Sequence, residues 1–136
     1  MVQGQNANLE KLTNYKIAFF TKKLNLTAQE AEKFWPVYNE FQDKRQLISL
    51  ERTQINKNFN VYGETMDEKE LINAGNKIID LELKNAALAQ EYHKKFLEIL
   101  PPVKVLKLYQ AENQYRNQLL NELQDRQQAP AAGRPR

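Results

Sequence analysis

Residues 27–38 read TAQEAEKFWPVY, and this stretch decides the fold because it marks the start of a long helix. Thr27 and Glu30 form a capping box, in which each side chain can accept a hydrogen bond from the other residue's backbone N–H. Beyond this box, side chains that suit a helical seam recur at alternating steps of four and three residues: Phe34, Tyr38, Phe41, Arg45, Ile48, Arg52, Ile55 and Phe59. The pattern predicts a helix over about 27–59. We expect a bend near Trp35, because Pro36 removes one backbone hydrogen bond.

Three further helices are predicted around this one. Apolar spacing and stop signals place them at about 8–24, 67–99 and 101–125. Gly63 marks the turn before the second of these, and Thr65 and Asp67 are rival N-caps for it. Pro101 and Pro102 end that helix and open the last one. The expected fold class is all-α, with four helices and a long central helical hairpin of elongated form.

The expected domain organisation is a single helical domain at 8–126. Residues 1–7 are polar, and residues 127–136 are rich in Gln, Ala, Pro and Arg. Neither end has enough apolar side chains to pack, so both are expected to be disordered.

The register of the hairpin can also be predicted. A turn centred near Gly63 pairs residues whose numbers sum to about 127, which places Arg45 beside Glu82 as an ion pair. The helix at 67–99 carries a second apolar stripe beside its seam: Ile72, Ile79, Leu83 and Ala86. A helix that is apolar on two sides must bury both, so this stripe needs another helix or a second subunit.

Composition excludes several classes of function. The 136 residues include 41% hydrophobic and 27% charged residues, and 20 basic residues are interleaved with 17 acidic ones, for a net charge of +3. Nucleic-acid binders usually concentrate their basic residues on one face, so no nucleic-acid partner is expected here. The mean hydropathy of −0.75 indicates that much of each helix faces water. There is no cysteine for disulfides or thiol chemistry. No membrane span and no signal peptide are predicted.

Residues that could support catalysis or bind a metal are sparse. His93 is the only histidine, and a zinc site normally takes three or four ligands. Ser49 is the only serine, and no motif surrounds it; the four glycines are scattered and form no phosphate loop. We therefore expect no enzyme activity, no catalytic residue, no metal site and no cofactor.

Two segments resemble a known family. Residues 23–38 resemble the L-T-x-x-Q region of the Spy/CpxP family of small periplasmic helical proteins, and residues 99–108 resemble that family's second copy of the motif. The two segments are most similar to a branch of this family found in Bacteroidetes-type bacteria. The resemblance covers residues 9–123, approximately. Pro101 and Pro102 replace the Leu-Thr of the second motif.

The resemblance implies an antiparallel, cradle-shaped homodimer in the periplasm, whose signal peptide has been removed. It implies an ATP-independent chaperone that binds unfolded or partly folded clients on an amphipathic, basic surface. Aromatic residues beside lysines fit this function, although they also fit core aromatics flanked by solvated lysines. The expected client-contact residues are Phe20, Lys23, Lys44, Arg45 and Arg52.

Two alternatives to the chaperone remain open. One is a regulatory adaptor or stress sensor that binds a single envelope signalling protein through a defined face. The other is a metal-responsive sensor, which is disfavoured because metal-sensing relatives use several histidines and this chain has only His93.

Overall fold

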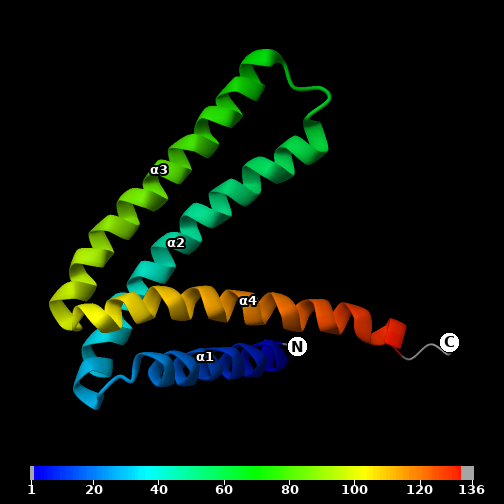
Figure 1. Ribbon diagram of the computed structural model, residues 1–136. Helices are drawn as coiled ribbons and strands as arrows, with labels where there is room; N and C mark the ends of the chain where they lie inside the picture. Colours follow the sequence, from blue (N-terminus) through cyan, green and yellow to red (C-terminus); the bar gives the residue numbers. More distant parts are fainter. Residues whose placement is uncertain (1, 133–136) are drawn as a thin grey trace. The chain divides into compact units, whose positions relative to one another are not determined.

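The computed structural model describes the backbone of residues 2–132 and the side chains of residues 10–125. Within residues 2–132 it contains four helices and no strand, which confirms the all-α class and the central hairpin (Figure 1). The helices are α1 (Val2–Leu24), α2 (Ala28–Tyr62), α3 (Glu68–Ile99) and α4 (Pro102–Ala132).

The outer ends of α1 and α4 differ from the sequence-based expectation. We expected disorder at residues 1–7 and 127–136, but α1 begins at Val2 and α4 continues to Ala132. Extending an existing helix adds one hydrogen bond for each residue fixed, so elongation is favoured once a helix has formed. Met1 and residues 133–136 lie outside the described residues.

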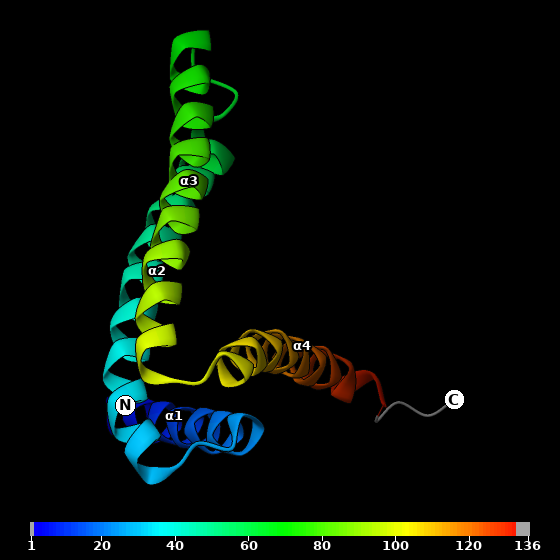
Figure 2. The same cartoon turned by 60° about the vertical axis from the view of Figure 1, so that its left-hand side comes forward.

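The chain forms two compact units. Unit 1 takes residues up to 31 and from 100 onward, and unit 2 takes residues 32–99. Unit 1 contains α1 and α4, which lie side by side (Figures 1 and 2). They are antiparallel, because Asn25 contacts Lys104 and Tyr15 contacts Gln118. Unit 2 contains almost all of α2 together with α3, and these helices form the hairpin.

Aromatic side chains join α1 to α4 in unit 1. The Tyr115 ring of α4 lies with its centroid 6.0, 5.5 and 5.8 Å from those of Tyr15, Phe19 and Phe20 of α1. Phe20 is completely buried. Burial also raises the pKa of Tyr115. Five smaller side chains of unit 1 are also buried: Leu24, Leu100, Val105, Leu108 and Ala111.

The turn between α1 and α2 is set by its local sequence. Asn25 adopts a left-handed backbone conformation with φ of 52°, which Asn tolerates better than most residues. The Asn25 N–H bonds to the Lys22 carbonyl and the Leu26 N–H bonds to the Thr21 carbonyl, as in a Schellman motif. The predicted capping box is confirmed, with the Thr27 N–H donating to Glu30 at 3.0 Å and the Glu30 N–H donating to Thr27 at 3.1 Å.

Lys104 fastens this turn to the start of α4. Its Nζ donates to the Asn25 carbonyl oxygen at 2.7 Å and to the Glu30 carboxylate at 2.6 Å. The Lys104 and Glu30 side chains are only 17% and 18% exposed, so water screens this pair less than it screens a pair on the open surface. The hydrogen bond from Lys104, followed by the one from the Thr27 N–H, holds the pKa of Glu30 below its ordinary value of 4.5.

Replacing Glu30 by Gln should destabilise unit 1 in a pH-dependent way. A carboxyl whose pKa is lowered by folding stabilises the folded state above its unfolded pKa, and this contribution is lost as the pH falls through the folded pKa. The wild type should therefore melt above Glu30→Gln at pH 7, and the gap should close on titration below the ordinary value of 4.5. Circular dichroism melts at pH 7, 5 and 3 measure this difference. Glu32→Gln, an exposed carboxyl on the same helix, is the control; a gap that stays constant at all three pH values would contradict the assignment.

Unit 2 has its core at the open end of the hairpin, away from the turn. Phe34, Tyr38 and Phe41 of α2 are buried against Tyr92 and Phe96 of α3. The Phe41 and Tyr92 rings stack at 4.9 Å, and the Phe96 centroid lies 5.7 Å from that of Phe34. Phe34, Tyr38 and Phe41 are seam positions that the sequence predicted for α2, so this part of the core was predicted correctly.

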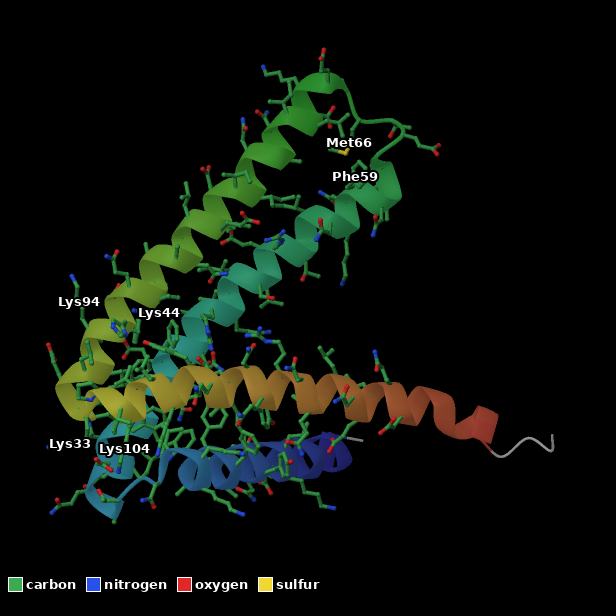
Figure 3. The ribbon with its side chains drawn as sticks, in the orientation of Figure 1. Lys33, Lys44, Phe59, Met66, Lys94 and Lys104 are labelled. Atoms are coloured by element: carbon green, nitrogen blue, oxygen red, sulfur yellow. The ribbon has the colours of Figure 1, made fainter. Side chains whose placement is uncertain are left out.

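At its other end the hairpin turns between Tyr62 and Glu68. Asp67, rather than Thr65, caps α3, since its side chain accepts the Glu70 N–H at 2.8 Å. Gly63 does not adopt a left-handed conformation. Glycine is required there for space instead, because a Cβ would lie 2.5 Å from the Phe59 carbonyl oxygen. Phe59 and Met66 lie on the two sides of this turn (Figure 3).

Candidate binding surface

Glu40 of α2 contacts residues of α3 next to the aromatic core of unit 2. The Tyr92 hydroxyl donates a hydrogen bond to its carboxylate, and the Nζ atoms of Lys44 and Lys95 lie 3.6 and 3.7 Å from it. Both ammonium groups also lie near the Tyr92 ring, at 5.2 and 4.4 Å from its centroid. The hydrogen bond from Tyr92 is the main reason that the pKa of Glu40 lies below its ordinary value.

The register of the hairpin differs from the predicted one by about one heptad. Facing residues have numbers that sum to about 134, as in the ion pair of Arg52 with Glu82 at 3.2 Å and that of Lys95 with Glu40. The predicted partner of Glu82 was therefore wrong, since Glu82 pairs with Arg52 and not with Arg45. The stacked Phe41 and Tyr92 rings, rather than a tight turn at Gly63, set this alignment.

Between these ion pairs lies an open groove of about 390 Å³, which we call the mixed-charge groove. From α2 it is lined by Lys44, Leu47, Ile48 and Glu51. From α3 it is lined by Lys84, Ala87, Leu88 and Glu91. Each helix thus contributes a lysine, two apolar residues and a glutamate at the same helical spacing. Figure 3 shows Lys44 on the part of α2 that lies beside α3.

A second hollow of about 270 Å³ lies nearer the turn. Its lining includes Ile55 and Asn58 of α2 and Ala74 of α3, together with Met66. Ile55 and Asn58 continue the α2 series begun by Glu51, at steps of four and three residues. Along this side of the hairpin, therefore, the side chains of α2 and α3 do not close over one another.

The second apolar stripe of α3 is exposed. Ile72, Ile79 and Leu83, which we call the outer stripe, are 56%, 55% and 65% exposed. Sequence reasoning expected this stripe to be covered, because large apolar side chains are normally buried. Among residues 10–125, whose side chains the structure describes, none covers it, so it remains available to a second molecule.

Two of the predicted client-contact residues lie on α1. Phe20 is 0% exposed, so the prediction that it contacts a client was wrong: its ring packs edge-on against Tyr115. Lys23 is exposed, and its Nζ lies 5.5 Å from the centre of the Phe19 ring. Lys23 thus remains accessible to a partner.

The other three predicted residues lie on α2. Lys44 is at the rim of the mixed-charge groove. The Arg45 guanidinium stacks 4.3 Å from the centre of the Phe41 ring and donates to Gln42, which leaves this side chain half-buried. Arg52 is exposed and paired with Glu82. Of the three, Lys44 has the clearest relation to a surface that could receive a partner.

Sequence reasoning missed the mixed-charge groove. The signal was present, since Lys44 to Glu51 and Lys84 to Glu91 repeat one pattern: lysine, apolar residues three and four positions later, and glutamate seven positions later. Only the correct register brings the two copies together, with Lys44 opposite Glu91 and Glu51 opposite Lys84. The predicted register would have separated them by about one heptad.

Among residues 10–125, no three His, Asp or Glu side chains are grouped as metal ligands would be. None of the helices, over the part that the structure describes, is apolar for long enough to cross a membrane. We find no match between this chain and any protein-family model, curated protein or solved structure.

Proposed function

We propose that this protein is an ATP-independent, chaperone-like protein of the periplasm that binds unfolded or partly folded clients. The observation that carries the proposal is the outer stripe, which exposes more than half of Ile72, Ile79 and Leu83 along one face of α3. Contiguous apolar surface of this kind marks an interaction site on a soluble protein. The resemblance of residues 23–38 and 99–108 to the L-T-x-x-Q motifs supports the periplasmic location and the homodimer.

The proposed mechanism is weak contact at several points. Lysines and arginines such as Lys23, Lys44 and Arg52 attract acidic client segments, and the outer stripe holds their apolar side chains. Fully burying one large apolar side chain contributes about 1.5–3 kcal/mol, so a few such contacts give reversible binding. Release then needs no nucleotide, and the function is binding rather than catalysis.

Replacing the outer stripe by glutamine should weaken client protection. In the triple variant Ile72→Gln, Ile79→Gln and Leu83→Gln, we expect the concentration that halves client aggregation to rise about tenfold, the change that ~1.4 kcal/mol of lost binding produces. Glutamine is a good helix former, and these positions are already exposed, so the fold should persist. The measurement is light scattering of reduced lysozyme and of heat-denatured citrate synthase, with circular dichroism to check helix content.

The control is a triple glutamine variant on α4. Leu106, Leu120 and Leu123 are 65%, 52% and 52% exposed, so the change in exposed apolar surface is similar. The control should protect both substrates as well as the wild type does. If wild type and outer-stripe variant protect equally, or if neither protects either substrate, the chaperone proposal is wrong.

The mixed-charge groove favours a second candidate, the regulatory adaptor. A defined groove with charges of both signs suits one structured partner better than a range of unfolded chains. An adaptor would bind one envelope signalling protein with saturable one-to-one stoichiometry and would protect unrelated denatured proteins poorly. Calorimetric titration and the aggregation assay together separate the two candidates.

A further inference from the structure

The mixed-charge groove has a local two-fold symmetry. α2 and α3 are antiparallel, and each contributes the same lysine-to-glutamate quartet, so the groove presents a similar outline from either end. Each end carries one charge of each sign, with Lys44 across from Glu91 at one end and Glu51 across from Lys84 at the other. The quartets extend for about 10 Å along the helices, which is two helical turns.

The two ends differ in how far their charges are already neutralised. Lys44 pairs with Glu40, and Glu91 pairs with Lys95 at 3.5 Å. Glu51 and Lys84 form no ion pair within residues 10–125. The charges available to an incoming partner are thus a carboxylate on the α2 side and an ammonium on the α3 side.

The floor of the groove is apolar. Among its lining residues Leu47 is 63% exposed, and Ile48 and Leu88 are half-buried. The volume of about 390 Å³ falls within the range of sites that bind a partner's side chains or a small ligand. An occupant therefore needs an apolar face.

The walls of the groove also restrict the backbone of the occupant. In the interior of a helix the backbone N–H and C=O groups bond to one another, so α2 and α3 offer none to a guest here. A strand buried in the groove would leave its own backbone groups without partners, which is costly. In a helical occupant the backbone hydrogen bonds are made within the helix itself. Its side chains also recur at the same heptad spacing as those of the groove walls.

We propose that the mixed-charge groove binds one amphipathic α-helix of a partner protein, with its apolar stripe on the floor, a basic flank facing Glu51 and an acidic flank facing Lys84. The inference rests on the adaptor form of the proposed function and specifies its partner. If the partner helix bound in the opposite direction, its basic flank would face Lys84 and its acidic flank would face Glu51. The charges of Glu51 and Lys84 therefore select one direction of binding.

The probe is a synthetic 21-residue helical peptide with a leucine stripe, lysines on one flank, glutamates on the other and a dansyl group at its N-terminus. Fluorescence anisotropy gives its affinity. Energy transfer from Trp35, the only tryptophan, reports its direction. The full-length protein should bind this peptide saturably at one site. A peptide of the same composition with two central prolines should bind at least about tenfold more weakly, because each proline breaks the helix.

Leu47 and Leu50 provide a matched pair of variants. Both are exposed leucines of α2, at 63% and 53%, but only Leu47 lines the groove. Leu47→Gln should weaken peptide binding about tenfold, whereas Leu50→Gln should leave it unchanged. Equal effects of the two changes would overturn the proposal.

The rim charges test the direction of the helix. Glu51→Lys should weaken binding about threefold, as expected for losing one exposed pair. Adding Lys84→Glu exchanges the two charges, so affinity should recover while energy transfer from Trp35 changes because the peptide binds reversed. Recovery with no change in transfer would overturn the proposed direction.

The outcomes separate this inference from the chaperone proposal. Peptide binding that depends on Leu47, without protection of denatured proteins, supports the groove and contradicts the chaperone. Protection that depends on the outer stripe, with no peptide binding, contradicts the groove alone. Leu47-dependent binding of cis-parinaric acid with no binding of the peptide would assign the groove to an acyl chain and overturn the proposal.

Discussion

Phe96→Ala should destabilise unit 2 by about 3–5 kcal/mol, the usual loss when a buried phenylalanine is truncated to alanine. Its ring is completely buried and lies 5.7, 5.9 and 6.5 Å from those of Phe34, Phe41 and Tyr92. Small domains are stable by only about 5–15 kcal/mol, so the loss takes a large part of the total.

Urea unfolding followed by Trp35 fluorescence measures this loss. Trp35 reports on unit 2, because its ring packs 4.9 Å from Phe34 and 5.7 Å from Tyr38. The control is Leu97→Ala, which removes an apolar side chain that is 42% exposed on the adjacent position of α3. Leu97→Ala should cost well under half as much. Similar costs for the two variants would show that the aromatic core does not hold the hairpin together.

Phe20→Glu should unfold unit 1 at pH 7 rather than reveal a client contact. The Phe20 side chain is 0% exposed, its ring centroid lies 5.8 Å from that of Tyr115, and Lys16 Nζ lies 5.7 Å from the ring centre. Removing a buried phenylalanine costs about 3–5 kcal/mol, and burying a carboxylate in its place adds a desolvation cost that the nearby Lys16 does not fully offset. We expect loss of helix content and rapid amide exchange in α1 and α4.

Lys23→Glu is the matched charge substitution on the same helix. Because Lys23 is exposed, this variant should keep the wild-type urea midpoint and should serve as the test of client attraction. Wild-type stability in Phe20→Glu, measured by urea unfolding and hydrogen exchange, would mean that the α1–α4 packing is wrong.

Features that depend on neighbouring residues could be predicted from the sequence. The Thr27–Glu30 capping box and the start of α4 after Pro101 involve residues that are close in the chain. The core positions Phe34, Tyr38 and Phe41 of α2 followed from their heptad spacing. These signals are local, because a helix places residues three and four apart on one face whatever it packs against.

Features that depend on how two helices align could not be predicted. The register was expected from the position of Gly63, but the Phe41–Tyr92 stack aligns the helices differently. For the same reason the ion pair of Glu82 and the mixed-charge groove were missed. Phe19 and Phe20 are adjacent and both apolar, so periodicity alone does not say which ring faces the centre of the packing.

Unit 1 is built from both ends of the chain, and this affects the order in which the protein folds during synthesis. Tyr15 of α1 packs against Tyr115 of α4, and the hairpin lies between them in sequence. While the ribosome is translating, α1 emerges long before its packing partner, whereas α2 and α3 are complete once residue 99 has been made. The hairpin should fold first, and a nascent chain interrupted before α4 should expose the aromatic face of α1.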